Sequence, residues 1–301
     1  MGPPGAEGSS AVDPLVVETA GRFSVFRLPA RVRPRHNVPL AGGLAILLFL
    51  VLGSFIVPAL SPYGPQEANP ADALVSPSLH HPFGTDESGF DVMTRVFYAA
   101  RIDLSLSALG VGLGLLIGVL LGVAAGFSRG LLGEIAMRVV DLIQAFPLFI
   151  LAVALVALSG NHLSNIVWAL AFLTTPIFLR LIRSRVLTIR EQRYIEAAVA
   201  LGNSRRRLLM RHVLPNALSP VIVQFGISMG YAILTIAGLA FLGVGVQVPT
   251  PEWGSMILIG RNNITTGQWW TVVFPGIWLA LAVVGLNLLS DGIERAREVH
   301  R

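Results

Sequence analysis

Residues 104–127 read LSLSALGVGLGLLIGVLLGVAAGF and contain no charged side chain. A hydrocarbon core about 30 Å thick is crossed by about 20 apolar residues in an α-helix, so this stretch predicts a transmembrane helix. Glycine recurs in it at every fourth position, at Gly110, Gly114, Gly118, Gly122 and Gly126. This spacing leaves one helix face without side chains, so that a neighbouring helix can approach closely. We therefore expect residues 104–127 to form a packing helix rather than a pore wall.

Five further apolar runs predict transmembrane helices near residues 40–60, 139–159, 163–182, 217–246 and 271–290. The whole chain is 53% hydrophobic and only 13% charged, whereas about a quarter of the residues of a soluble domain are charged. We therefore expect an all-α polytopic membrane protein with about six transmembrane helices. Within the fifth run, Gly226 and Gly230 repeat the small-residue spacing and predict a second close helix contact.

The arginines predict the orientation of these helices. All 22 basic residues are arginine, and most fall on one side of the predicted spans. Only Arg95, Arg101 and Arg261 fall on the other side, so the positive-inside rule predicts that both termini are cytoplasmic. The expected organisation is a flexible basic tail (1–38), a first transmembrane helix with an outer loop (39–103), a transmembrane core (104–292) with a cytoplasmic loop (185–216), and a cytoplasmic tail (293–301).

Several kinds of chemistry are excluded by composition. The chain has no cysteine, so disulfides and thiolate chemistry are absent. It also has no lysine, so it contains neither a Walker A phosphate-binding loop nor a Schiff-base lysine. Any ATP hydrolysis must belong to another polypeptide, and we expect no cofactor in this chain. His80, His81 and His162 show no metal-ligand spacing and are predicted to be surface residues, so no metal site is expected.

Two other functional classes remain open. The segment 226–230 reads GISMG and matches the nucleophile elbow of hydrolases, but Ser228 lies in a continuous apolar run, which favours a buried helix contact. A proton-coupled carrier or channel would need carboxylates deep in the membrane that face one another. Asp141 and Asp291 lie near the ends of their spans, so we interpret them as anchors or helix contacts.

Pro147 and Pro176 are expected to kink their helices.

The longest internal polar segment is the loop 185–216. We expect two short helices here, separated at Gly202, Asn203 and Ser204, because glycine commonly ends a helix and serine caps the next. The second helix combines several arginines with apolar residues and could lie on anionic lipid. The order of residues favours another interpretation. Its pattern E-A-A-x3-G-x9-H-x-L-P resembles the EAA loop of ABC importer permeases, and it is carried by Glu196, Ala197, Ala198, Gly202, His212, Leu214 and Pro215.

The resemblance extends over nearly the whole chain after the tail. The stretches HPFGTD (81–86), MRVVD (137–141), FLGVGVQVPTPEWG (241–254) and LSDG (289–292) are similar to motifs of the C-type permeases of the dipeptide, oligopeptide and nickel family. Phe90 stands where that family usually has arginine, and the Asp-Pro that usually follows the last motif is missing.

The resemblance implies a type I ABC importer permease in the bacterial cytoplasmic (inner) membrane. Its partners would be a homologous second permease, one or two ABC ATPase subunits that bind ATP and Mg, an extracytoplasmic substrate-binding protein and the lipid bilayer, but no nucleic acid. Arg205 and Arg206 would join the EAA residues in contacting the ATPase. The expected substrate is a di- or oligopeptide; nickel, glutathione or another small solute remains the alternative within the family.

Overall fold

The computed structural model describes residues 38–127 and 131–298, which are mostly helical. Five helices are long and apolar enough to cross a membrane: α1 (Val38–Leu60), α2 (Val92–Phe127), α5 (Leu163–Arg190), α9 (Ser219–Phe241) and α11 (Trp270–Glu298). A sixth span results if α3 (Leu131–Gln144) and α4 (Leu148–Ser159), which meet at a bend of 87°, are counted together. The predicted all-α architecture with about six transmembrane helices is therefore confirmed. The basic tail predicted for residues 1–38 lies outside the described residues, except for Val38.

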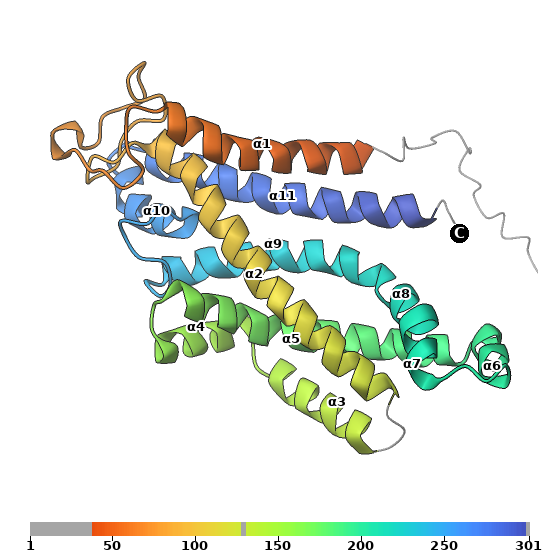
Figure 1. Cartoon of the computed structure of the whole chain (residues 1–301). Coiled ribbons are helices and arrows are strands. Elements are labelled where there is room, and N and C mark those ends of the chain that lie inside the picture. The colour runs from red at the N-terminus through yellow and green to blue at the C-terminus, as the bar shows by residue number, and fades with distance from the viewer. Residues whose placement is uncertain (1–37, 128–130, 299–301) are drawn as a thin grey trace, which may run out of the picture. The chain divides into compact units, whose positions relative to one another are not determined.

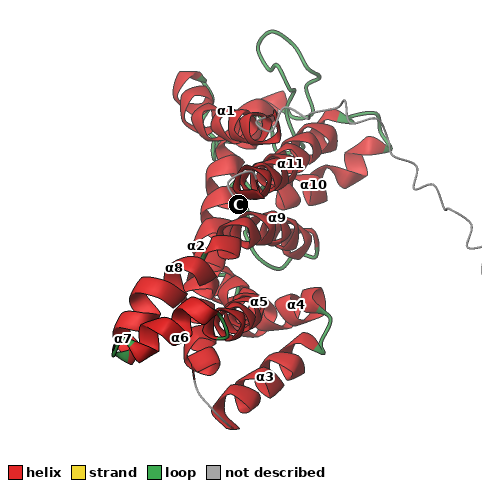
Figure 2. Ribbon diagram, turned by 90° about the vertical axis from the view of Figure 1, so that its right-hand side faces the viewer, coloured by secondary structure: helices red, strands yellow, loops and turns green. Residues whose placement is uncertain are grey.

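The remaining elements are short: η1 (Pro70–Asp72), α6 (Arg193–Ala200), α7 (Arg205–Leu208), the π-helical turn η2 (Leu209–Val213), α8 (Leu214–Ala217), α10 (Trp253–Gly260) and η3 (Arg261–Ile264). Among the described residues, β structure is limited to one bridge between Thr85 and Asp91. In Figures 1 and 2, α1, α11, α9, α5 and α3 follow one another across the bundle, and α2 crosses them obliquely. α2 packs against α1, α5 and α9 and thereby connects helices from both sides of this row.

Several helix ends differ from the predicted spans. α2 begins at Val92, so the boundary expected between 39–103 and 104–292 falls inside this helix. Asp91 explains the early start, because its Oδ2 accepts hydrogen bonds from the Thr94 N–H at 2.8 Å and from the Thr94 hydroxyl at 2.7 Å. A carboxylate in this position satisfies free N–H groups of the first turn. Likewise, α5 continues to Arg190 into the predicted loop, and α11 continues to Glu298 into the predicted tail.

The span predicted at 139–159 is broken rather than kinked. α3 already begins at Leu131, and residues 145–147 separate it from α4. Pro147 lacks an N–H group, and proline disfavours helical geometry at the residue before it. Pro176, in contrast, is buried inside α5, which continues as one helix.

The glycine face of α2 lies against α5. A Cβ atom added at Gly110 or at Gly118 would stand 2.6 Å from a side-chain atom of α5, closer than carbon atoms can approach. The facing residues of α5 repeat at the same four-residue interval and are Leu170, Thr174, Phe178, Ile182 and Val186. In α9, Gly226 similarly faces Ser290 of α11, whereas Gly230 is less crowded, with its nearest neighbours 3.8 Å away.

The segment 247–254 docks on the first turns of α2. Arg95, which is fully buried, donates through Nη1 to the carbonyl oxygens of Pro65 at 3.0 Å and Pro249 at 3.1 Å. Trp253, also fully buried, donates its indole N–H to the Val96 carbonyl at 3.0 Å and its backbone N–H to Asp103 at 3.2 Å. These bonds hold α10 beside α2.

The prediction that His81 is a surface residue is wrong. His81 is buried, its Nδ1 lies 3.0 Å from Asp91 Oδ1, and its ring stacks on Tyr63 at 4.4 Å. The partner that buries it is the residue that also caps α2, which no spacing of histidines could reveal. His80 and His162 are exposed, and the described residues contain no cluster able to hold a metal ion.

Candidate functional site

The predicted loop forms a compact projection at one end of the helices. It consists of α6, α7, η2 and α8, which connect α5 to α9. In Figure 1, α6 and α7 extend beyond the end of the bundle at which α1 begins and α11 ends. The residues predicted to contact a partner therefore lie at the end of the bundle where α1 begins and α11 ends.

α6 has one face toward the protein and one toward the surroundings. Ile195 and Ala198 are buried, whereas Glu196 and Ala197 are exposed. Of Glu196, Ala197 and Ala198, which the resemblance implies to contact the ATPase, Ala198 therefore faces inward. Ala198 lies three residues after Ile195, so both fall on the same side of the helix and face inward.

Gly202 ends α6 in a left-handed turn. Its φ angle is +76°, and the Gly202 N–H donates to the Val199 carbonyl at 2.9 Å. The Asn203 N–H and side-chain amide both donate to the Ala198 carbonyl, at 3.2 Å and 3.0 Å. This pair of backbone bonds is the Schellman motif that commonly closes helices. A Cβ atom at Gly202 would meet nothing within 4 Å, so the backbone angle, and not space, favours glycine.

The second half of the loop leads without a gap into α9. The Ser204 hydroxyl accepts a hydrogen bond from the Arg207 N–H at 3.3 Å and caps α7. Pro215 lies in the first turn of α8, and the Asn216 side chain donates to the His212 carbonyl at 2.7 Å. Leu208 and Val213 anchor this half in the core, while Arg206 and Pro215 are exposed and His212 and Leu214 are half-buried. The side chain of Arg205 lies outside the described part of the structure.

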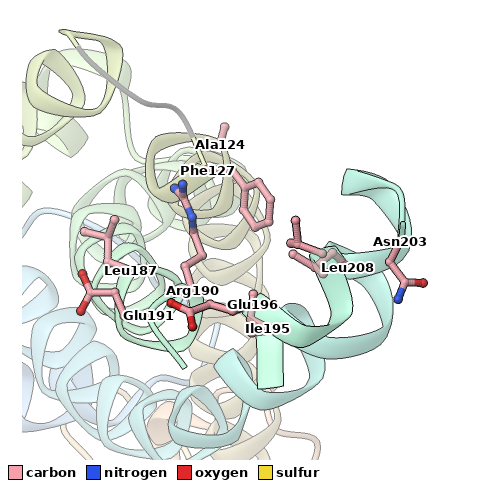
Figure 3. A pocket seen from close by; sticks show the side chains of 10 residues that line it. Ala124, Phe127, Leu187, Arg190, Glu191, Ile195, Glu196, Asn203 and Leu208 are labelled. Atoms are coloured by element: carbon pink, nitrogen blue, oxygen red, sulfur yellow. The ribbon is translucent and has the colours of Figure 1, made fainter. Parts of the chain in front are cut away.

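A cavity of about 1300 Å³ lies between this loop and the ends of α2 and α5. Figure 3 shows Glu191 and Glu196 on its wall with Arg190 above them. Arg190 Nη1 donates to the Gly126 carbonyl at 2.7 Å, and its guanidinium lies 5.4 Å from the Phe127 ring centroid. Arg190 thereby satisfies a free carbonyl at the end of α2. This role could not be predicted from the sequence, because the acceptor is a backbone carbonyl 64 residues away in the chain.

The outer surface of the loop combines positive charge with exposed apolar side chains. Arg206, Arg207 and Arg211 are exposed, as are the larger apolar residues Tyr194, Leu201 and Met210. Leu201 is 84% exposed. Exposed apolar groups that cluster on a surface are typical of sites that bind another protein or a membrane.

The hydrolase hypothesis fails on the geometry of Ser228. This residue is buried in the continuous helix α9, and its hydroxyl accepts a hydrogen bond from the Gln224 amide at 3.2 Å. The nucleophile elbow requires a sharp turn between a strand and a helix, so the GISMG segment is a helix contact.

Comparisons with known proteins agree with this architecture. Residues 118–298, more than half of the chain, match the family described as the binding-protein-dependent transport system inner membrane component. The chain belongs to this family. The permease is therefore a multi-pass protein of the cytoplasmic membrane and a transporter subunit, not a catalytic enzyme. The resemblance noted from the EAA loop and the other motifs is confirmed.

Relatives extend the similarity over most of the permease. It is 41% identical to the dipeptide transport system permease protein DppC of Alkalihalophilus pseudofirmus, covering 84% of this chain and 83% of the relative. It is 39% identical to the di/tripeptide transport system permease protein DppC of Pseudomonas aeruginosa, covering 87% and 88%. It is 36% identical to the glutathione transport system permease protein GsiD of Escherichia coli, covering 87% and 86%.

Two solved structures share the fold. A chain of the MetNI methionine ABC transporter, in inward-facing conformations, matches 69% of the permease and 97% of its own length with a TM-score of 0.56. A chain of an amino acid ABC transporter crystallised with histidines matches 67% and 94% with a TM-score of 0.51. Both are 18% identical in sequence. The predicted fold of an ABC importer permease is therefore confirmed.

Proposed function

We propose that this permease is a translocation subunit of an ATP-driven importer for di- or oligopeptides. The observation that carries this proposal is its identity of 36–41% to permeases named for dipeptide, di/tripeptide and glutathione transport, over 84–87% of the chain. Glutathione is itself a small peptide, so all three names agree on a short peptide as the substrate.

The chain needs partners to use ATP. Without lysine it cannot build a Walker A loop, so ATP and Mg would be bound by one or two separate ATPase subunits. A homologous second permease and an extracytoplasmic binding protein would complete the importer. The exposed arginines and apolar side chains of α6, α7 and η2 suit an ATPase contact on the cytoplasmic side.

Alternating access requires that the loop transmit a movement. Leu208 and Val213 are buried, and η2 and α8 pack on α5, which favours movement of the loop together with α5 and α9 as a lever. An ATPase can drive this movement only if its two nucleotide states bind the loop differently. Closure of the ATPases would then tilt the inner ends of α5 and α9.

The first test is affinity purification of the tagged permease from its native membrane in mild detergent. The expected result is a complex that contains a second permease and P-loop subunits and hydrolyses ATP in a vanadate-sensitive manner. The binding protein recovered with it, or encoded beside it, can then be tested for peptide and for glutathione binding. A permease that purifies alone and transports solute by itself would contradict the proposal and favour a self-sufficient carrier.

Glu196 provides a sharper test of the proposed contact between the loop and the ATPase. It is exposed at the edge of the cavity, beside the exposed Ala197. Reversing its charge with Glu196→Arg is expected to lower the recovery of ATPase subunits several-fold, because the ATPase groove would meet a cation where it binds an anion. Glu196→Gln, which keeps the shape, serves as the control and should lose less. Equal recovery of ATPase from both variants and the wild type would show that this carboxylate is only solvated.

A further inference from the structure

An ion pair joins α3 to α5 within the membrane-spanning part of the chain. Asp141 lies near the end of α3, Arg180 lies in the second half of α5, and Arg180 Nη2 stands 2.5 Å from Asp141 Oδ1. The two side chains are nevertheless 54% and 49% exposed. The pair is therefore a contact between helices that leaves much of both charged groups open to the surroundings.

Such a pair is poorly suited to a lipid-facing surface. Charged side chains in transmembrane segments are costly in hydrocarbon and almost always face the bundle interior or a water-filled cavity. A half-exposed pair in water carries no comparable penalty. The exposure of Asp141 and Arg180 thus indicates that this face meets water or a partner subunit rather than lipid.

The break between α3 and α4 points to the same face independently. Residues 145–147 are not helical, and all residues from 144 to 150 are exposed. Non-helical backbone at membrane depth is tolerated only where protein covers it or where it lines a water-filled cavity. Ala145 and Phe146 donate their N–H groups to the Asp141 and Ile143 carbonyls at 2.9 Å and 3.4 Å, and Pro147 has no N–H group, so only carbonyl groups of the break could lack a partner.

The neighbouring helices show where the open face lies. α4 leans on α9 through Phe149, since a Cβ atom added at Gly238 would meet the Phe149 ring at 2.7 Å. α3 packs on α2 and α5, and α4 packs on α5 as well as on α9. The two halves of the broken span meet at an angle of 87°, and Asp141 lies in the last turn of α3 before the break. In secondary transporters, the ends of broken helices contact the substrate.

We propose that the break and the Asp141–Arg180 pair form a polar station on the wall of the translocation pathway, where the pair separates to bind the charged termini of a peptide. The Arg180 guanidinium would receive the peptide carboxylate in a two-pronged hydrogen-bonded contact, and Asp141 would receive the peptide ammonium. This inference rests on the proposed function, because it concerns the pathway of that same importer.

The first experiment tests whether water reaches the station. Because the chain has no cysteine, Gln144→Cys and Asp141→Cys each introduce its only thiol. Leu120→Cys is the matched control, since Leu120 is 63% exposed on the apolar surface of α2. In the assembled importer, a charged methanethiosulfonate is expected to label positions 141 and 144 at least tenfold faster than position 120. Labelling at 141 and 144 as slow as at 120 would overturn the proposal, because the break would then be covered.

The second experiment tests contact with substrate. Uptake is compared between wild type and each variant for a free dipeptide, its N-acetyl derivative and its C-terminal amide. The ratio of variant to wild type for one peptide cancels any preference of the binding protein. Arg180→Gln should raise KM several-fold for peptides with a free carboxylate but not for the amide. Asp141→Asn should do so for peptides with a free ammonium but not for the acetylated peptide.

Two outcomes separate this inference from the proposed function. If the wild-type complex imports peptide and hydrolyses ATP, but both variants impair all three peptides equally, the pair is only a link between α3 and α5. The charge swap Asp141→Arg with Arg180→Asp would then restore uptake of every peptide alike. If the wild-type complex imports no peptide at all, the proposed function itself fails, whatever the labelling shows.

Discussion

Among single residues, Gly202 has a backbone conformation that strongly restricts which residue can replace it. Its φ of +76° lies in the left-handed region, where a residue with a Cβ atom is strained by about 1–2 kcal/mol. Asn203, Val199 and Ala198 close the turn around it. The direction in which α7 leaves α6 therefore depends on this one backbone angle.

Replacing Gly202 with valine is expected to abolish most peptide uptake while the permease remains inserted in the membrane. The β-branched side chain opposes the left-handed angle, so the turn between α6 and α7 opens and the ATPase contact is displaced. Gly202→Asn is the control, since asparagine tolerates this region. The measurement is uptake together with substrate-stimulated ATPase activity. Normal uptake by the valine variant would show that the turn does not transmit the movement.

Asp86 is a second residue whose environment makes a testable difference. It is buried in the segment between α1 and α2, and its Oδ1 accepts hydrogen bonds from the Ser88 and Phe90 N–H groups at 3.0 Å each. Burial raises the pKa of this carboxyl above 3.8, although these bonds and the charge of Arg95 oppose the shift. The folded state therefore holds the proton more tightly than the unfolded chain, and ionisation costs stability.

Because the pKa of Asp86 is raised, the pH dependence of stability has a definite direction. The stabilising contribution of protonated Asp86 is complete below pH 3.8 and is lost as the pH rises through the raised pKa. Asp86→Asn keeps the acceptor oxygen but cannot ionise. The thermal midpoint of the wild-type complex should thus fall relative to that of the variant as the pH rises over this window. A wild-type midpoint that rises relative to the variant would show that attraction to Arg95 outweighs burial.

At the scale of elements, the contact between α2 and α5 depends on the absence of side chains along one face. Gly118 illustrates the requirement, since an added Cβ would lie 2.6 Å from Phe178 Cβ and 2.8 Å from the Thr175 carbonyl oxygen. The Thr175 carbonyl oxygen is a backbone atom, so a change of side-chain rotamer cannot move it away. Gly112 lies on the same helix but points into open space, with nothing within 4 Å.

This pair of glycines allows a matched comparison. Gly118→Ala should destabilise the permease by about 1–3 kcal/mol, the usual cost of overpacking, because the helices must move apart. Gly112→Ala should be neutral or stabilising by up to about 1 kcal/mol, since alanine favours helix over glycine. Thermal unfolding of both variants in detergent measures the difference. Equal stability of the two would mean that α2 and α5 are not held this closely in the membrane.

At the scale of the whole molecule, the arginine distribution predicts that α6 and α7 face the cytoplasm. Leu79, on the segment between α1 and α2, is fully exposed, and Met210 is 58% exposed on the loop. In this cysteine-free chain, Leu79→Cys should react with a membrane-impermeant maleimide in intact spheroplasts. Met210→Cys should react only after the membrane is dissolved in detergent. The reverse pattern would invert the orientation and remove the ATPase from this surface.

Much of the molecule could be predicted from residues close together in the chain. Long apolar runs predicted the spans, because a single helix must satisfy its own backbone in lipid. The turn at Gly202 was predictable for a similar reason, since a helix ends through bonds among adjacent residues. The spacing of Glu196, Gly202, His212 and Pro215 indicated the family before any contact was known.

Contacts between distant residues were decided only by the tertiary structure. The inward position of Ala198, the burial of His81 by Asp91 and the cap that Arg190 places on Gly126 each join segments that local patterns treat separately. The pairing of Asp141 with Arg180 is of the same kind. Hydropathy and periodicity determine which segments enter the membrane, because each helix must hydrogen-bond its own backbone and expose apolar side chains to lipid. Which polar groups meet there depends on how the helices pack, and packing is a property of the whole chain.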